Sequence, residues 1–214
     1  MPKSAFAVLS SLFAISDEQA MWRVQAHDDA AAFAQLMRRW ERPIRNLCTR
    51  MISDGHRAED LTQDVFARVY ARRKDYQPKG KFSTWLWRIA LNLCHDELRR
   101  IRRCGVHSLD DLPGEDDRDR SIWAVAPMPA PDGMLDESER AGIVRGAVMQ
   151  LPEHYRSVVV LRHYEDLKFR EIAEVLGIPE GTVKSRMAEA MTQLGRALEH
   201  VLRDRPELEC DKVK

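Results

Sequence analysis

Between Phe169 and Met187 the chain reads F-R-E-I-A-E-V-L-G-I-P-E-G-T-V-K-S-R-M, and this segment fixes the fold class of its surroundings. A helix-turn-helix needs a small residue where its two helices cross and a residue that tolerates a tight turn between them. Ala173 and Gly177 occupy these two positions. Apolar anchors flank them on both sides: Ile172, Leu176, Ile178 and Val183. The segment therefore predicts a helix-turn-helix.

The second helix of this motif has a candidate DNA-reading face near its N-terminal end. Once the anchors are buried, the opposite face is free to enter a major groove. The residues that point outward there are Thr182, Lys184, Ser185, Arg186 and Glu189. An ordinary helical hairpin with a solvated charged face is the alternative. DNA binding is favoured over it because the small residue, the glycine and the anchors occur together.

Helical patterns also occupy the sequence on either side of this motif, and no run alternates as a strand would. After the motif's turn, a long helix is expected from about Glu180 to Leu202, and before the motif two more over Ser138–Gln150 and Glu153–Tyr164. Further upstream, Ser16 and Gln19 form a capping-box signature, and apolar residues recur at helical spacing over Asp28–Met51, where Pro43 is expected to kink or divide the helix.

Two further helices are expected in the first half of the chain. The first carries Leu61, Val65, Phe66 and Val69. A loop over Asp75–Phe82 follows, and Ser83 or Thr84 is expected to cap the next helix.

A proline-rich stretch divides the chain. Four prolines fall within nineteen residues, amid Asp, Glu and Gly: Pro113, Pro127, Pro129 and Pro131. Such a stretch cannot continue a helix. The chain is therefore predicted to be all-α, with two small helical bundles joined by a flexible linker. The predicted divisions are an N-terminal extension (1–16), a first bundle (17–105), an acidic linker (106–137), a helix-turn-helix bundle (138–205) and a tail (206–214).

The net charge of zero hides an uneven distribution. Residues 68–103 contain eleven basic and three acidic residues, whereas residues 106–139 contain two basic and ten acidic ones. At physiological salt charges are screened over about 8 Å, so a partner on the first block hardly senses the second. Arg outnumbers Lys by 26 to 8, which favours bidentate contacts to phosphate or carboxylate. We predict a nucleic-acid-binding protein despite the neutral total.

Composition excludes other classes. With 44% apolar residues the chain can bury a core, and no apolar run approaches the roughly 18 residues of a membrane span. Met1–Ile15 has the outline of a short signal peptide, but with one Lys and an interrupted apolar core an N-terminal extension is favoured. No phosphate-binding glycine loop, H-E-x-x-H or nucleophile elbow is present, so an enzyme is disfavoured and no cofactor is expected.

Four widely spaced cysteines indicate reduced thiols in a cytosol: Cys48, Cys94, Cys104 and Cys210. Cys94, His95, Cys104 and His107 supply enough ligands for zinc. Their spacing fits no familiar zinc module, so buried thiols are favoured and no metal is predicted.

The basic block is interleaved with aromatic residues. Between Tyr76 and Arg103 it contains the cations Lys79, Lys81, Arg88, Arg99, Arg100, Arg102 and Arg103, and the aromatics Tyr76, Phe82, Trp85 and Trp87. Cations for the backbone and aromatic faces for bases are what single-stranded DNA requires. Each Trp taken singly is more readily explained as core; for the segment as a unit, strand binding is favoured.

Four segments in order resemble successive landmarks of a known family. They are D-L-T-Q-D-V-F (Asp60–Phe66), F-S-T-W-L-W-R-I-A-L-N (Phe82–Asn92), L-P-E-H-Y-R-S-V-V-V-L-R (Leu151–Arg162) and G-T-V-K-S-R (Gly181–Arg186). Together they resemble the bacterial RNA polymerase sigma factors, and more narrowly the extracytoplasmic-function class that keeps only regions two and four. The resemblance covers about Asp17 to Arg205.

This resemblance implies a role for each matched position. Asp60, Gln63, Asp64 and Phe66 match the helix that grips the clamp coiled coil of the largest polymerase subunit. The surface for the melted minus-ten element corresponds to Tyr76, Lys79, Lys81, Phe82, Thr84, Trp85, Arg88, Asn92, Arg99 and Arg100. Thr182, Lys184, Ser185, Arg186 and Glu189 match the reader of the minus-thirty-five element. Extruding a base costs a few kcal/mol, which an aromatic and polar pocket offsets.

The resemblance further implies a non-catalytic, cytoplasmic subunit that binds core polymerase, including its flap, and promoter DNA both as duplex and melted. It also implies an anti-sigma factor and no membrane insertion. The sequence departs from the family at M-A-E-A-M, where Glu189 replaces a basic residue and is suited to accept a hydrogen bond from a cytosine amino group. A stand-alone dimeric helix-turn-helix regulator is the alternative.

Overall fold

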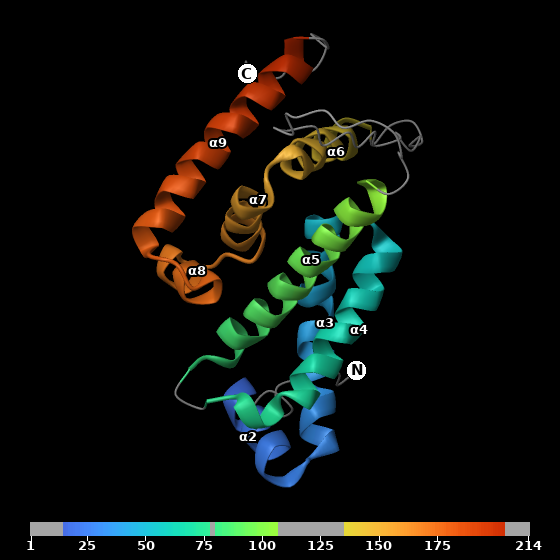
Figure 1. Cartoon of the computed structure of the whole chain (residues 1–214), viewed down its shortest axis with the longest axis vertical. Helices are drawn as coiled ribbons and strands as arrows, with labels where there is room; N and C mark the ends of the chain where they lie inside the picture. The colour runs from blue at the N-terminus through green and yellow to red at the C-terminus, as the bar shows by residue number, and fades with distance from the viewer. Residues whose placement is uncertain (1–14, 78–79, 107–134, 204–214) are drawn as a thin grey trace, which may run out of the picture.

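The fold is entirely helical in the part of the chain that a computed structural model describes, residues 15–77, 80–106 and 135–203 (Figure 1). These residues form eight α-helices and two short helical segments, and none forms a strand. The all-α prediction is therefore confirmed. None of the described helices is both long enough and apolar enough to cross a bilayer.

The N-terminal domain consists of four α-helices and a short 3₁₀ turn. They are α2 (Asp17–His27), α3 (Ala30–Ile52), α4 (Gly55–Ala71), η1 (Arg73–Asp75) and α5 (Phe82–Val106). Helices α3, α4 and α5 pack on one another around a core that includes Leu36, Leu47, Val65, Phe82 and Leu86. The predicted capping box is present, because the hydroxyl of Ser16 accepts from the N–H of Gln19 while the Gln19 side chain accepts from Ser16.

Pro43 was predicted to kink or divide its helix, and α3 continues through it undivided. The predicted cap of α5 is wrong: the helix begins at Phe82, so neither Ser83 nor Thr84 is its N-cap. The N–H of Phe82 is satisfied instead by the carboxylate of Glu18 on α2 at 3.2 Å, a long-range partner that local sequence patterns do not show.

The C-terminal domain is built from α6 (Leu135–Gln150), α7 (Glu153–Val159), a π-helical segment η2 (Val160–Tyr164), α8 (Phe169–Leu176) and α9 (Glu180–Arg203). The single helix expected over 153–164 is therefore α-helical in its first half and π-helical in its second. Helix α8 has the predicted bounds. The first three residues of α6 fall inside the predicted linker, and the rest of that linker, residues 107–134, lies outside the described residues.

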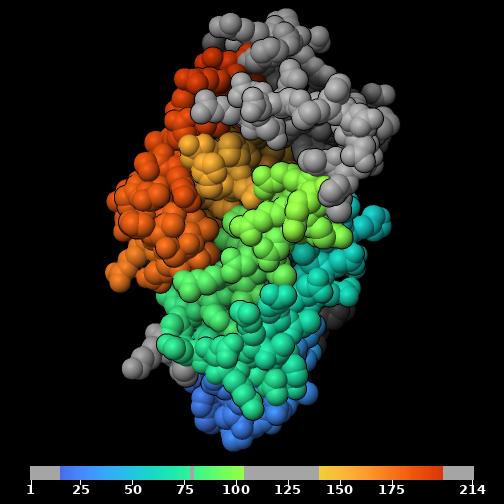
Figure 2. All heavy atoms as spheres, viewed as in Figure 1, coloured from blue at the N-terminus to red at the C-terminus, as the bar shows by residue number. Residues whose placement is uncertain are grey.

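The two domains pack against each other along α5. Contacts join α5 to α8, and α3 to α6, α7 and η2. In Figure 1, α5 runs between α3 and α4 on one side and α7 and α8 on the other. The space-filling view shows the C-terminal domain, coloured orange, in direct contact with the green surface of α5 (Figure 2).

Candidate nucleic-acid interface

Helix α5 carries a polar stripe at helical spacing along the side that faces the C-terminal domain. The stripe consists of Lys81, Thr84, Arg88, Asn92, His95, Arg99 and Arg102. Of these, Thr84 and His95 are partly buried and the others are exposed. Residues three or four apart share one face of a helix, so the cations and amides expected to hold a melted strand do lie together. Lys79 lies outside the described residues.

An aromatic cluster lies at the start of the same helix. The ring of Tyr76 lies 5.4 Å from that of Trp85 and 6.1 Å from that of Phe82. Tyr76 is 2% exposed and Phe82 is fully buried, whereas Trp85 is partly exposed. Tyr76 and Phe82 thus face the core in this structure, and their contact with a melted strand stays a prediction. Trp87 is core, as expected of a single Trp.

The loop before α5 is fixed by side chains of α2. The amide nitrogen of Gln25 donates to the carbonyls of Lys74 and Tyr76, each at 3.1 Å. The phenol of Tyr76 donates to the carbonyl of Gly80 at 2.9 Å, and burial, with the nearby charge of Glu18, raises the pKa of Tyr76 to about 12. These contacts therefore hold the described residues on either side of positions 78–79.

At the far end of α5, arginines form a local charge network. Arg99 pairs with Asp96 at 3.1 Å. Arg100 and Arg57 both contact Glu97, at 2.7 and 2.8 Å. The hydrogen bond from Arg100 is the main cause that lowers the pKa of Glu97. Arg100 therefore lies toward α4 and away from the stripe, while Arg99 lies on it.

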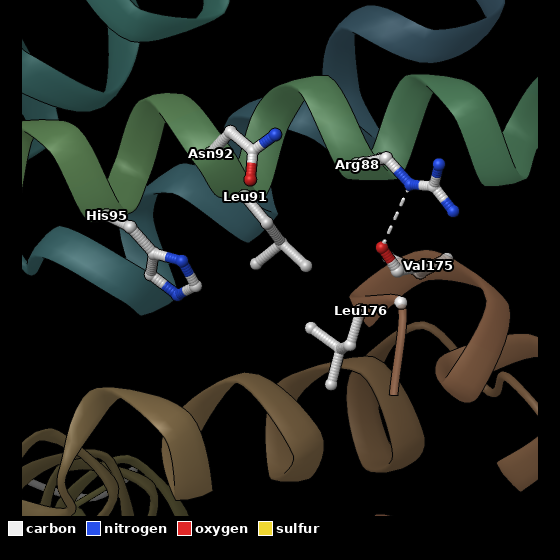
Figure 3. Close-up of a pocket in the computed structure, with 7 residues that line it drawn as sticks. Arg88, Leu91, Asn92, His95, Val175 and Leu176 are labelled. Carbon is white, nitrogen blue, oxygen red and sulfur yellow. Dashed lines mark hydrogen bonds between the residues drawn. The ribbon is translucent and has the colours of Figure 1, made fainter. Parts of the chain in front are cut away.

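Helix α8 of the C-terminal domain contacts the first half of the stripe. The ammonium of Lys81 lies 2.6 Å from the carboxylate of Glu171. The guanidinium of Arg88 donates to the main-chain oxygen of Val175 at 3.3 Å and also to that of Glu174. Figure 3 shows Arg88 directed at the end of α8, beside a cavity of about 350 Å³ between the two helices. The cavity is lined by Arg88, Leu91, Asn92, His95, Val175, Leu176 and Gly177.

The predicted helix-turn-helix is formed by α8 and α9. Gly177 has φ +67°, and its N–H and that of Ile178 both donate to the carbonyl of Ala173. A left-handed residue that ends a helix favours glycine, as expected for this turn. Of the predicted anchors, Ile172 and Val183 are buried and Leu176 and Ile178 are partly buried. Further along the inner face of α9, Met187, Ala190 and Leu194 are also buried.

The outer face of α9 is open where DNA reading was predicted. Lys184, Ser185 and Glu189 are exposed, and Thr182 and Arg186 are partly so. Lys184 pairs with Glu180 at 2.7 Å, and Glu189 accepts from Gln193 at 3.0 Å. These contacts lie within α9, so they hold the side chains along the helix surface without covering it.

Helix α4 presents an acidic and amide-bearing face. Asp60, Gln63 and Asp64 are exposed at positions that share one side of the helix. Phe66 is 3% exposed and belongs to the core of this structure, and its contact with polymerase stays a prediction. Its period places it with Leu61, Val65 and Val69 on the inner face.

The cysteine prediction is confirmed for the two described thiols. Cys48 and Cys94 are both buried, with their sulfurs 3.7 Å apart between α3 and α5. The two described thiols therefore face each other. Among the described residues no group of three His, Cys, Asp or Glu side chains is arranged to hold a metal. His107 lies outside them.

Sequence reasoning missed the residues that join the domains. Arg156, 8% exposed, donates to the carbonyl of Met51 at the end of α3 at 2.7 Å, and to the carbonyls of Met149 and Leu151 in its own domain. Burial lowers the pKa of Arg156 to about 10. In the sequence, Arg156 lies among Val and Tyr in an ordinary amphipathic pattern, so nothing there indicates that it joins the two domains.

The π-helical segment supplies a second joint between the domains. Its wider turn places Tyr164 and Glu165 against Arg50 of α3. The guanidinium of Arg50 lies 4.2 Å from the centre of the Tyr164 ring and 3.4 Å from the carboxylate of Glu165. Burial raises the pKa of Glu165, and the charge of Arg50 opposes that rise.

Comparison with known proteins agrees with this architecture. Residues 36–104 match the Sigma-70 region 2 family and residues 141–194 match Sigma-70, region 4. The chain is similar to the ECF RNA polymerase sigma factor SigW of Bacillus subtilis, with 33% identity over 79% of this chain and 90% of SigW. It is also similar to the RNA polymerase sigma-H factor of Pseudomonas aeruginosa, with 31% identity over 88% of this chain and 96% of that protein.

A solved structure has the same fold. It is the sigma factor RpoE in complex with the anti-sigma factor NepR from Bartonella quintana, with a TM-score of 0.60 and 24% identity over 78% of this chain and 96% of RpoE.

An all-helical, two-domain protein with a helix-turn-helix and a cationic helix beside it defines a DNA-binding transcription protein without catalytic machinery. The chain belongs to the extracytoplasmic-function RNA polymerase sigma factors, and it is a transcription initiation factor rather than an enzyme. The alternative of a stand-alone dimeric regulator finds no support in these comparisons.

Proposed function

We propose that the polar stripe of α5 binds the melted minus-ten strand, that α9 reads the minus-thirty-five duplex, and that α4 docks on core polymerase. The observation that carries this proposal is the stripe itself. Arg88, Asn92 and Arg99 repeat along one exposed side of α5, next to the partly exposed ring of Trp85. Cations that follow a backbone, beside an aromatic face, suit single-stranded DNA better than duplex DNA.

For the minus-ten element, we assign contact to Lys81, Thr84, Trp85, Arg88, Asn92 and Arg99. Tyr76 and Phe82 support this surface from within the core, because their rings pack under Trp85. A fixed loop and helix start lower the entropy lost when a strand binds. This support is what the contacts of Gln25 and Glu18 provide.

For the minus-thirty-five element, Lys184, Ser185 and Arg186 lie on the exposed side of the first turns of α9, where a recognition helix reaches base edges. Glu189 lies one turn further along and suits a cytosine amino group. Two modest contacts become effective together when one polymerase holds both domains near one promoter.

For the partners, the acidic face of α4 suits a basic surface on polymerase, and the family assigns that surface to the clamp coiled coil of the largest subunit. We also infer contact between the C-terminal domain and the flap, and regulation by an anti-sigma factor. The related RpoE was solved with such a factor, NepR. Because core polymerase and the chromosome are cytoplasmic, we infer that this protein works there.

The test is run-off transcription with purified core polymerase, with and without the full chain, on genomic fragments that include the region upstream of its own gene. We expect discrete transcripts that require the protein, and we expect R88A to lose most of them. Transcripts that do not depend on the protein would contradict the proposal, as would an R88A variant of unchanged activity.

A further inference from the structure

We propose that the C-terminal domain acts as an intramolecular cover for the minus-ten surface, with helix α8 occupying the cations that the melted strand must contact. The inference rests on the proposed function in one respect, that Lys81 and Arg88 bind the strand. The covering contacts themselves are independent of it. The melted strand and α8 then compete for the same side chains.

The chemistry of the cover resembles that of the strand it replaces. Arg88 contacts the main-chain oxygens of Glu174 and Val175, which belong to the last turn of α8. Carbonyls in the last turn of a helix lack partners in the helix and carry its negative dipole end. One helical turn earlier, Glu171 offers Lys81 a carboxylate at 2.6 Å. Oxygen acceptors and negative charge are also what a phosphate backbone presents to Arg and Lys.

The cover is held by contacts beyond these two cations. Arg156 reaches the carbonyl of Met51 in α3, and His95 and Ser157 lie 3.0 Å apart across the interface. Glu153 forms an ion pair with Arg102 at the far end of the stripe. Contacts with the C-terminal domain therefore recur at intervals along the stripe, at Lys81, Arg88, His95 and Arg102.

The interface is also built to separate. The cavity of about 350 Å³ between Arg88 and Leu176 leaves the two helices incompletely packed, in contrast to a domain interior. Most of the interdomain pairs are polar and partly exposed, which is typical of interfaces that open. Separation exposes the stripe and replaces the contacts of α8 with contacts to DNA.

The cover is selective for one of the two DNA-binding surfaces. The reading face of α9 remains exposed, with Lys184 and Ser185 open to solvent. The closed chain is thus able to meet duplex DNA through α9 before its minus-ten surface is released. Melted DNA is the ligand expected to favour the open form, because only that form offers it the whole stripe.

The first test is a zero-length crosslink in the free full-length protein. A carbodiimide converts the Glu171 carboxylate into a reactive O-acylisourea. The amine of Lys81 attacks the acyl carbon, the carbodiimide part leaves as a urea, and an amide bond then joins two residues 90 positions apart. We expect mass spectrometry to find this crosslinked peptide in the wild type and not in E171Q. Addition of random-sequence single-stranded DNA should reduce its yield. Absence of the crosslink from the wild type, or a yield unaffected by DNA, would overturn the inference.

The second test measures affinity for the same single-stranded DNA by fluorescence anisotropy. The variant E153Q/E171Q removes two interdomain ion pairs and leaves every proposed DNA contact intact. Its matched control is D166N/E199Q, which removes two charges from the same domain: Asp166 pairs with Arg162 in its own domain, and Glu199 lies exposed on α9.

We expect E153Q/E171Q to bind about three- to tenfold more tightly than the control, the range that two weak ion pairs allow. Equal affinities would overturn the cover. Unchanged run-off transcription by R88A would contradict the proposed function instead, and in that case the crosslink would still form.

Discussion

The backbone N–H of Phe82, the first residue of α5, donates a 3.2 Å hydrogen bond to the carboxylate of Glu18 on α2. The two residues are 64 positions apart in the sequence. Glu18 thus does for α5 what an N-cap side chain ordinarily does from the preceding residue, and it adds a negative charge at the positive end of the helix dipole. The start of the minus-ten surface depends on this contact.

We expect E18A to lower the free energy of unfolding by about 1 kcal/mol, as loss of a helix cap does. Burial opposes ionisation of Glu18, but hydrogen bonds from the N–H groups of Glu18 and Phe82 outweigh it and lower the pKa below 4.5. A carboxylate with a lowered pKa stabilises the fold above its unfolded pKa, and this contribution is lost as pH falls through the folded value. Urea unfolding from pH 7 to pH 3 should therefore show the wild type converging on E18A.

The matched control for this experiment is E59A, which removes an exposed carboxylate from α4. Its unfolding free energy should stay within about 0.5 kcal/mol of the wild type. A difference between E18A and wild type that persists undiminished at pH 3 would contradict the assignment of the cap to the ionised carboxylate.

Arg156 is the buried joint between the domains, and its removal should be costly. In R156M three main-chain oxygens lose their donor, those of Met51, Met149 and Leu151. Each unsatisfied buried acceptor is expensive, so we expect a loss of about 1–3 kcal/mol of stability. Thermal unfolding of the full chain measures this loss of stability.

The control is R170M, because the side chain of Arg170 is 84% exposed and its removal should leave the melting temperature nearly unchanged. An R156M variant as stable as R170M would show that the three hydrogen bonds of Arg156 do not contribute to stability.

The acidic face of α4 should govern association with core polymerase. D60K/D64K places positive charge where a basic partner surface is expected, and like charges at an interface are costly, so we expect binding to weaken at least about tenfold. Surface plasmon resonance against core polymerase measures it. The control E41K/E199K makes the same change in charge at exposed residues of α3 and α9, away from this face. Equal loss in both variants would point to net charge rather than to a docking surface.

Local patterns determined most of what could be predicted. The capping box at Ser16, the turn at Gly177 and the anchors of α9 depend on neighbours a few residues away, and all three are confirmed. The prediction that failed concerns a long-range partner: α5 begins at Phe82, whose N–H is capped by Glu18 of α2 and not by Ser83 or Thr84. The rings of Phe66 and Tyr76, which were predicted to lie at binding surfaces, complete a core whose other walls come from distant helices.

The interdomain contacts were beyond prediction for the same reason. Glu171 and Glu153 appear in the sequence as ordinary solvated charges, and only the packing of α8 and α7 against α5 brings them to Lys81 and Arg102. Residues separated by 90 and 51 positions share no periodic pattern. A block of basic residues in the sequence indicates that its side chains bind negatively charged groups, but it does not indicate which carboxylates of the same chain form ion pairs with them.

Arg186 should be the strongest contributor to minus-thirty-five recognition, because a guanidinium contacts a guanine edge with two hydrogen bonds. We expect R186A to reduce run-off transcription about tenfold or more, a loss of 1–3 kcal/mol in the discrimination of one base pair. The control R196A removes an exposed Arg from the same helix, about three turns further from the predicted groove, and should retain activity.

An independent measurement shows whether R186A keeps its fold and local geometry. The pKa of His154 is lowered by burial and, next, by the charge of Arg186. Removal of that charge should raise the pKa of His154 partway toward 6.5, which NMR titration of the imidazole detects. Lost transcription together with this upward shift assigns the defect to the reading face of α9. Retained transcription with the same shift would show that Arg186 lies beside His154 as the structure has it but contacts no base.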